Sequence, residues 1–211
     1  MSLFDDTSLF TSGGFKRELY ELENATLIFI ESFLTKEESD ILYFKLLHEI
    51  AWQESSIIIY GKLHDTPRLT AWYGDKDKTY RFSGNTMTTL PWTSDLLFVK
   101  EKVEKEAGVI FNSVLLNLYR TGKDSVGWHR DNEKEFGINP VIASVSFGET
   151  RPFQLRYKFN KEVNKITIPL NHGSLLIMKD ETQHYWEHQI PKTTRSISPR
   201  INLTFRVIKT F

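Results

Sequence analysis

Two side chains that commonly bind metal ions stand one residue apart near the middle of the chain. They are His129 and Asp131, in the stretch GWHRD. Alternate residues of an extended chain point to the same side, so this imidazole and this carboxylate can face one centre. Because the sequence contains no cysteine, a metal must be held by nitrogen and oxygen ligands. A His-x-Asp pair by itself is more often an ordinary surface pair, so a metal site needs a further ligand.

A third ligand has to come from a histidine further along the chain. His172 lies in the turn pattern Asn-His-Gly, which is typical of a loop. His184 and His188 are four residues apart in HYWEHQI, which we interpret as a strand, so they would share one face and spacing does not choose between them. Two histidines and one carboxylate form the facial triad of non-heme iron(II) oxygenases, which leaves metal positions open for cosubstrate and oxygen.

A polar face runs along the last apolar segment of the chain. Arg200, Asn202, Thr204 and Arg206 alternate with Ile201, Leu203, Phe205 and Val207. Six residues of strand span roughly 20 Å, but two long arginine side chains can lean inward around a short dicarboxylate and bind each end with a bidentate fork. In the run VLLNLY, Asn117 and Tyr119 also share a face and can join such a pocket. The alternatives are a strand that faces solvent and interior residues with local hydrogen bonds.

Helix signals come early in the sequence and strand signals later. Thr35 and Glu38 form a capping box before an apolar stripe that reaches about Ile50, and a second helix is predicted from Ser94 to a stop at Gly108. Residues 57–92 are rich in aromatic and turn residues and predict short strands and hairpins. From residue 113 onward strands follow one another, as the runs VLLNLY, ASVSFG, FQLRYK, KITIPL, GSLLIMK, HYWEHQI and INLTFRVI. This spacing predicts an antiparallel sandwich or barrel of the jelly-roll kind behind an N-terminal helical layer.

Composition and charge limit the class of protein. The 211 residues are 40% hydrophobic and carry no net charge, which fits one domain with a sizeable core. Residues 1–54 hold 11 acidic and 4 basic residues, so the remainder is basic, as either ordinary solvated charge or a phosphate-contacting face. The sequence shows no secretory signal pattern and no apolar run of about 18 residues, so we expect an intracellular protein that does not associate with a membrane. We expect it to be a monomer, located in the nucleus in a eukaryote or in the cytoplasm in a bacterium.

Four motifs occur together in a fixed order. They are NLY at 117–119, HRD at 129–131, EHQIP at 187–191 and PRINLTFR at 199–206. The series resembles the AlkB family of iron(II)- and 2-oxoglutarate-dependent dioxygenases over about residues 60–207, and among its members the chain looks most like AlkB homologue 2. The resemblance implies a double-stranded β-helix, that is, a jelly roll. It also implies Fe(II), with 2-oxoglutarate and O2 as cosubstrates.

The activity that the resemblance implies is oxidative removal of alkyl groups from nucleic-acid bases. Alkylated DNA, single- or double-stranded, would be the substrate, with lesions such as 1-methyladenine and 3-methylcytosine. An enzyme of the same family that acts on RNA or tRNA is the alternative within the class. From other classes, the alternatives are a catalytically silent jelly roll that binds nucleic acid or a partner and a zinc or manganese cupin, for which the paired arginines have no purpose.

The resemblance also carries residue roles onto this sequence. The iron ligands are His129, Asp131 and His188, which leaves His184 beside the site or in the core. Arg200, with Tyr119 and Asn202, would bind the far carboxylate of 2-oxoglutarate. Arg206 and Asn117 would bind the carboxylate next to the keto group.

Residues 55–92 resemble the family's nucleotide-recognition lid, between an N-terminal extension and helix (1–54) and a helix plus catalytic core (93–211). Tyr80 and Phe82 resemble its base-binding hairpin, with His129 as the opposite wall, although they can equally be core aromatics. Glu133 matches an acidic position that hydrogen-bonds an exocyclic amine. Tyr60 and Arg68 lie in a segment that resembles a substrate-binding segment of homologue 2. Tyr60 stands where that homologue carries a phenylalanine that it pushes into the base stack. The alternative is that Tyr60 contacts a partner or simply packs. Trp128 departs from the family pattern and can narrow the pocket or shield the iron.

Overall fold

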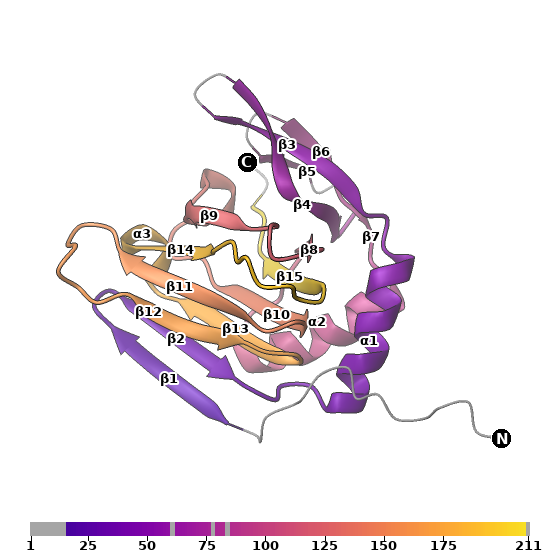
Figure 1. The fold of residues 1–211 in the computed structure, drawn as a ribbon, viewed down its shortest axis with the longest axis horizontal. Helices are drawn as coiled ribbons and strands as arrows, with labels where there is room; N and C mark the ends of the chain where they lie inside the picture. Colours follow the sequence, from indigo (N-terminus) through magenta and orange to yellow (C-terminus); the bar gives the residue numbers. More distant parts are fainter. Residues whose placement is uncertain (1–15, 60–61, 77–78, 83–84, 210–211) are drawn as a thin grey trace.

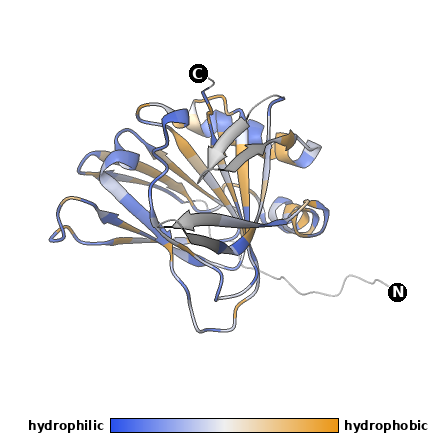
Figure 2. Cartoon of the chain, turned by 90° about the horizontal axis from the view of Figure 1, so that it is seen from above, coloured by the Kyte–Doolittle hydropathy of each residue, from blue (hydrophilic) through white to orange (hydrophobic). Residues whose placement is uncertain are grey.

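A large, mostly antiparallel sheet and a small antiparallel sheet face each other in the computed structural model, and two helices cover the outer side of the large sheet (Figure 1). The structure describes residues 16–59, 62–76, 79–82 and 85–209, and no side chain of residues 57–64 or 77–88. Figure 2 shows that the loops are largely hydrophilic and that hydrophobic residues concentrate along the strands. The mainly β fold class predicted from the sequence is confirmed.

Both long helices begin and end where the sequence predicts. Helix α1 (Lys36–Glu49) has Thr35 as its N-cap, with the complete capping box to Glu38. Helix α2 (Ser94–Ala107) begins after Thr93, whose side chain accepts a hydrogen bond from the Leu96 N–H, and ends at Gly108 in the left-handed conformation, with φ of 68°. These caps satisfy backbone groups that the first and last turns of a helix leave without partners.

The helices pack on the large sheet through apolar stripes. Leu42 and Leu46 of α1 and Val99 and Val103 of α2 belong to one buried cluster. The same cluster contains the apolar face of the last strand, β15 (Arg200–Arg206), namely Ile201, Leu203 and Phe205. Because side chains alternate along a strand, burying this face under the helices turns the opposite, polar face of β15 toward the small sheet.

Eight strands, four in each of the two sheets, make the jelly roll. The large sheet contributes β8 (Ser113–Tyr119), β15, β10 (Ile142–Gly148) and β13 (Ser174–Lys179), in neighbouring order. The small sheet has the order β12 (Ile166–Leu170), β11 (Arg151–Tyr157), β14 (Trp186–Ile190) and β9 (Val126–His129). The strand runs predicted from residue 113 onward are therefore confirmed except for the first part of HYWEHQI, and the inward faces of these strands enclose the space between the sheets.

The segment predicted as hairpins extends the large sheet. Strand β4 (Lys62–Gly74) pairs with β8 on one side and with β3 (Gln53–Ile59) on the other, and the short β7 (Leu90–Pro91) also pairs with β4. Strands β5 (Thr79–Phe82) and β6 (Asn85–Thr88) form a separate two-stranded sheet. The predicted hairpins are confirmed, whereas β4, at 13 residues, is longer than the short strands predicted for this region.

Two predictions about local structure are wrong. The N-terminal layer is not only helical, because β1 (Arg17–Leu22) and β2 (Ala25–Ile30) form a hairpin that pairs with β13 at the edge of the large sheet. Its turn uses Asn24 at φ of 55°, a conformation that asparagine tolerates better than most residues. HYWEHQI is not one strand, because the short helix α3 (Thr182–Tyr185) precedes β14 and places His184 on a helical turn. Another short helical turn, η1 (Lys134–Phe136), follows β9.

Membrane crossing was not expected from the sequence. Within the described ranges, no helix combines the length and the apolar character that a transmembrane span requires.

Gly148 ends β10 at a point where no side chain fits. It adopts φ of 85°, and a Cβ atom there would lie 2.4 Å from the Pro199 carbonyl oxygen. We expect Gly148→Ala to lower the free energy of unfolding by more than about 2 kcal/mol, through backbone strain and a clash with main chain. Gly127→Ala is the matched control, because its Cβ would meet no described atom within 4 Å. Equal urea midpoints for the two variants would contradict this assignment.

Candidate metal centre and anion pocket

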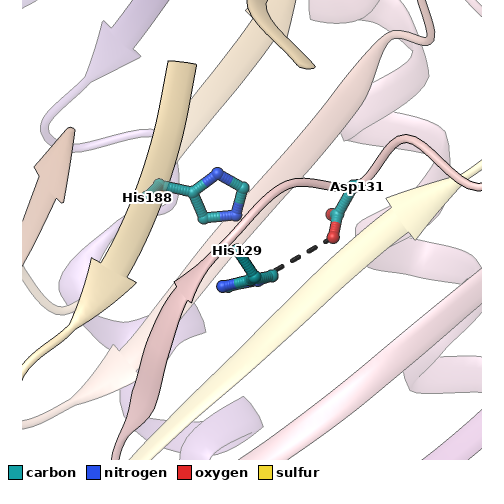
Figure 3. Close-up of side chains that lie close together, drawn as sticks. All are labelled: His129, Asp131 and His188. Carbon is teal, nitrogen blue, oxygen red and sulfur yellow. Dashed lines mark ion pairs between the residues drawn. The ribbon is translucent and has the colours of Figure 1, made fainter. Parts of the chain in front are cut away.

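Two histidines and one aspartate converge at the open end of the small sheet. Strands β9 and β14 pair so that His129 and His188 lie directly opposite each other, with ring centroids 4.2 Å apart. Asp131 follows β9 and is buried, with Oδ1 3.8 Å from His129 Nε2 (Figure 3). One ligand atom from each of the three residues lies within 4.8 Å of the others, close enough to share one metal ion.

Hydrogen bonds and packing leave one ring nitrogen of each histidine free to bind a metal. His129 Nδ1 lies 2.8 Å from the Gly127 carbonyl oxygen, which can only accept, so Nδ1 carries a proton and Nε2 is the atom of this ring that can bind a metal. His188 is 5% exposed and stacks on Phe153, with ring centroids 5.1 Å apart. Burial lowers the pKa of His188 to about 3, so its ring is neutral at physiological pH. Neutral imidazoles are the form that binds metal.

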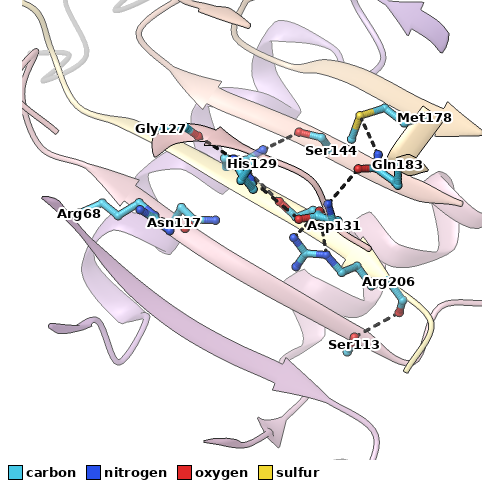
Figure 4. A network of polar contacts seen from close by, with 12 residues as sticks. Arg68, Ser113, Asn117, Gly127, His129, Asp131, Ser144, Met178, Gln183 and Arg206 are labelled. Carbon is cyan, nitrogen blue, oxygen red and sulfur yellow. Dashed lines mark hydrogen bonds and ion pairs between the residues drawn. The ribbon is translucent and has the colours of Figure 1, made fainter. Parts of the chain in front are cut away.

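Asp131 is held in its ionised form. Nε and Nη2 of Arg206 donate to its Oδ2 at 3.1 and 2.7 Å (Figure 4). Gln183 Oε1 accepts the hydrogen bond of the Asp131 backbone N–H at 3.0 Å. Burial alone would raise the pKa of the Asp131 carboxyl, but the charge and hydrogen bonds of Arg206 oppose burial most strongly, and this pKa lies well below its usual range. These contacts fix Oδ2 and leave Oδ1 toward the two histidines.

The three residues open into a cavity of about 540 Å³ between the two sheets. All of the predicted cosubstrate residues line it: Asn117, Tyr119, Arg200, Asn202 and Arg206. Two of the predicted substrate residues, Arg68 and Glu133, line it as well. The polar face of β15 therefore points into the cavity, and the alternative of a strand that faces solvent is excluded, since every residue of β15 is buried.

Arg200 carries hydrogen-bonding capacity that the protein itself does not use. It is 1% exposed, and Nη2 donates to the Ser146 hydroxyl at 2.9 Å. Its Nε and Nη1 atoms have no hydrogen-bond partner among the described residues. Burial lowers the pKa of Arg200 to about 10, so it stays charged at neutral pH. A buried cation with free donors is costly unless an anion joins it, and a carboxylate fits its planar fork.

The neutral polar residues of the cavity are partly engaged with one another. Asn202 donates to the Ser144 hydroxyl at 2.7 Å, and the Thr204 hydroxyl donates to Asn202 Oδ1 at 2.8 Å. Asn117 Oδ1 accepts from Arg68 Nε at 2.8 Å, which leaves the Asn117 amide hydrogens as donors toward the cavity. Arg68 therefore contacts the cosubstrate side of the cavity directly.

The other two candidate histidines lie outside the metal centre. His172 is buried in its turn, where Nδ1 accepts from the Gly148 N–H at 2.9 Å and Nε2 faces Asp40 Oδ1 at 3.1 Å. It ties α1 to the end of β10. His184 sits on α3, and its Nε2 is 3.5 Å from the Asn139 nitrogen. Strand pairing between β9 and β14 thus selects His188, a choice that local spacing left open.

The structure describes only some of the residues predicted to bind the base. Tyr60 lies outside the described residues, and for Tyr80 and Phe82 the structure describes only the backbone of β5. Trp128 is partly buried, and the guanidinium of Arg156 lies 4.3 Å from its ring centre, with Lys165 Nζ at 5.8 Å. These two cations hold the indole beside the cavity.

Two residues of the site were missed from the sequence. Gln183 precedes the expected ligand strand and gave no motif signal, although it holds the backbone of Asp131. Arg151 is 1% exposed and lies beside Tyr119, with its guanidinium carbon 5.7 Å from the ring centre. Its position in the alternating run RPFQLRY, in phase with the buried Phe153 and Leu155, was the signal that could have identified it.

The donor set suits iron(II) and a 2-oxo dicarboxylate. Two imidazoles and one carboxylate, with no thiolate, are the ligands of the non-heme iron(II) facial triad. The unused donors of Arg200 suit a carboxylate at the far end of the same cavity. The residues present therefore fit both groups.

Comparison with known proteins agrees with this geometry. The 2OG-Fe(II) oxygenase superfamily matches residues 26–206. An "Alpha-ketoglutarate-dependent dioxygenase alkB homolog 3" from Bos taurus is 44% identical over 184 residues, which cover 83% of this chain and 64% of the relative. A "DNA oxidative demethylase ALKBH2" from Mus musculus is 40% identical over 182 residues, which cover 82% of this chain and 76% of the relative. The matched region thus spans just under two thirds of the alkB homolog 3 proteins.

A solved structure supports the fold. The structure of OsALKBH1 superposes with a TM-score of 0.65 at 14% identity, over 90% of this chain and all of that one. Sequence and fold therefore agree, and the chain belongs to the AlkB family of the 2OG-Fe(II) oxygenase superfamily.

Proposed function

We propose that this protein uses iron(II), 2-oxoglutarate and O2 to remove alkyl groups oxidatively from nucleic-acid bases, with alkylated DNA as substrate. The observation that carries the proposal is one cavity that holds a His-Asp-His cluster and two buried arginines from the same strand. The names of the relatives, one a DNA oxidative demethylase, support the choice of DNA. We expect the protein to act as a monomer inside the cell.

Each polar residue of the cavity has a binding task in this proposal. His129, Asp131 and His188 hold the iron, and Arg206 keeps Asp131 ionised and correctly turned. Arg200 and Tyr119, with Asn202, hold the far carboxylate of 2-oxoglutarate, while Asn117 and Arg206 face the carboxylate beside its keto group. Iron, with O2 and 2-oxoglutarate, supplies the oxidising chemistry, and the protein supplies placement.

The alkylated base has to enter the cavity from the side of residues 55–92. An alkyl group on the base-pairing edge is out of reach within a duplex, so the base must be turned out of the stack. Glu133 lines the cavity, which supports its assignment as the acceptor of a hydrogen bond from an exocyclic amine. We assign the flat walls of the base pocket to Tyr80 and Phe82 on one side and His129 on the other. Arg68 joins the substrate side to the cosubstrate side through Asn117.

The test is turnover on matched oligonucleotides. Each carries one 1-methyladenine or 3-methylcytosine, as single-stranded DNA, duplex DNA or RNA, and succinate and formaldehyde are measured together. Equal amounts of both products on DNA support the proposal. Turnover on RNA alone would favour an RNA- or tRNA-acting enzyme, and no product with any substrate, despite bound iron, would favour a silent nucleic-acid- or partner-binding jelly roll.

Tyr60 is the candidate for the residue that opens the duplex. A phenol that stacks between base pairs offsets the loss of stacking of the base turned out, and a single strand does not need this contribution. We expect Tyr60→Ala to reduce kcat/KM on duplex DNA about tenfold, the effect of roughly 1.4 kcal/mol of lost stacking, and to change it little on single strands. Tyr60→Phe, which keeps the ring, should behave as wild type. Equal losses on both substrates would contradict a wedge.

A further inference from the structure

Arg151 is a buried cation on the inward face of the small sheet. It begins β11 and is 1% exposed. Phe153 and Leu155 follow it at every second position, and Phe153 stacks on the candidate ligand His188. Alternation along the strand therefore places Arg151 on the cavity side of the sheet, away from solvent.

Neutral carbonyl groups accept the hydrogen bonds of Arg151, and the carboxylates of Asp124 and Glu149 attract its charge without bonding to it. Its Nη2 donates to the carbonyl oxygens of Asp124, at 3.0 Å, and Pro191, at 2.6 Å. Its Nε and Nη1 have no hydrogen-bond partner among the described residues. The carboxylate of Asp124 is itself bound by Arg120, at 2.8 Å. Arg151 thus has no carboxylate bonded to its guanidinium and keeps two unused donor atoms.

A second buried guanidinium lies beside the same phenol ring. The Arg200 guanidinium carbon is 5.2 Å from the Tyr119 ring centre, and that of Arg151 is 5.7 Å away. After burial, the repulsion from Arg151 is one of the causes that lower the pKa of Arg200. Two like charges kept in a buried region are unfavourable in the empty protein, and an anion placed near both offsets that cost.

We infer that Arg151 is a positioning residue that sets the specificity for a 2-oxo acid with a second carboxylate. Arg200 and Tyr119 line the cavity, whereas Arg151 is not among its lining residues. Its charge therefore acts on the far carboxylate from behind Tyr119, through the field and through the position of the phenol. This inference rests on the proposed function, because it assumes that 2-oxoglutarate occupies the cavity.

The experiment compares two 2-oxo acids that differ only at the far end. 2-Oxoglutarate and 2-oxopentanoate have the same chain length, but the second ends in a methyl group. Dissociation constants for both are measured by anaerobic calorimetric titration of the iron(II)-loaded protein, without nucleic acid and without turnover. The variants are Arg151→Gln, which removes the charge, and Arg151→Lys, which keeps it but loses the planar fork. Lys158→Gln, at an exposed position just after the same strand, is the control for loss of one charge.

We expect Arg151→Gln to reduce the preference for 2-oxoglutarate over 2-oxopentanoate about tenfold, through weaker binding of the dicarboxylate alone. Arg151→Lys should keep the preference within about threefold, even if its melting temperature falls because two carbonyl contacts weaken. Lys158→Gln should match wild type. The ratio of two affinities in one variant cancels any general loss of folded protein.

An unchanged ratio in Arg151→Gln would overturn the inference and reduce Arg151 to a clamp between two loops. If Arg151→Gln does not fold, the test is Arg151→Lys, which keeps the charge. Loss of the preference for 2-oxoglutarate over 2-oxopentanoate in Arg151→Lys would also overturn the inference. Failure of the proposed function looks different, because the wild-type protein would then bind neither acid in the presence of iron.

Discussion

Replacing His129 with alanine is expected to abolish turnover and to leave the protein folded. His129 is the one member of the metal cluster whose side chain is about a third exposed, and it hydrogen-bonds the nearby Gly127 carbonyl. Loss of a direct ligand should exceed the roughly 10- to 100-fold loss that outer-sphere partners cause, so succinate formation should fall below detection. Calorimetry should show a melting temperature close to that of wild type.

The neighbouring ligand would make a less clean test. Asp131→Ala leaves the Arg206 guanidinium buried without its carboxylate, and breaking such a pair typically costs about 3–5 kcal/mol. Loss of activity would then be mixed with loss of fold. His184→Ala is the matched control, since His184 stands four residues before His188 but sits on α3 outside the cluster. Retained turnover in His129→Ala, or equal loss in His184→Ala, would contradict the proposed ligand set.

Arg200→Met is expected to weaken 2-oxoglutarate binding strongly without weakening the fold. Arg200 donates to Ser146 through Nη2, and its Nε and Nη1 are buried without partners in the described part of the chain. Charge-assisted hydrogen bonds contribute about 1.5–3 kcal/mol each, so loss of two to the far carboxylate should raise the dissociation constant at least about 100-fold. Replacing a buried charge with an apolar side chain of similar size is often neutral or stabilising, so the melting temperature should stay or rise.

The two readouts of Arg200→Met are measured on the same preparation, by anaerobic titration with 2-oxoglutarate and by calorimetry. Arg195→Met, on an exposed loop, is the control for the loss of one arginine. A fall in melting temperature with unchanged 2-oxoglutarate affinity would mean that Arg200 is a structural residue. The opposite pattern, weak binding in a stable protein, is the signature of a residue retained for its ligand.

Local sequence determined much of the framework. Thr35 and Glu38 fixed the start of α1, and Gly108 fixed the end of α2, because caps depend on groups within a few residues. Alternation with a period of two separated the polar and apolar faces of β15, since that period is a property of any extended backbone. The motifs around His129 and Arg200 then allowed the family to be recognised.

The tertiary structure decided what depends on segments far apart in the chain. Pairing of β9 with β14 placed His188 opposite His129 and left His184 on a helix, which the spacing of the two histidines could not decide. The packing of the two sheets also paired Arg206 with Asp131 and brought Arg151 beside Tyr119. Local pattern fixes which way a side chain points from its own backbone, but only the packing of two sheets fixes what it meets. For this protein, the sequence by itself therefore determined the kinds of residue that do the chemistry, and the fold determined their partners.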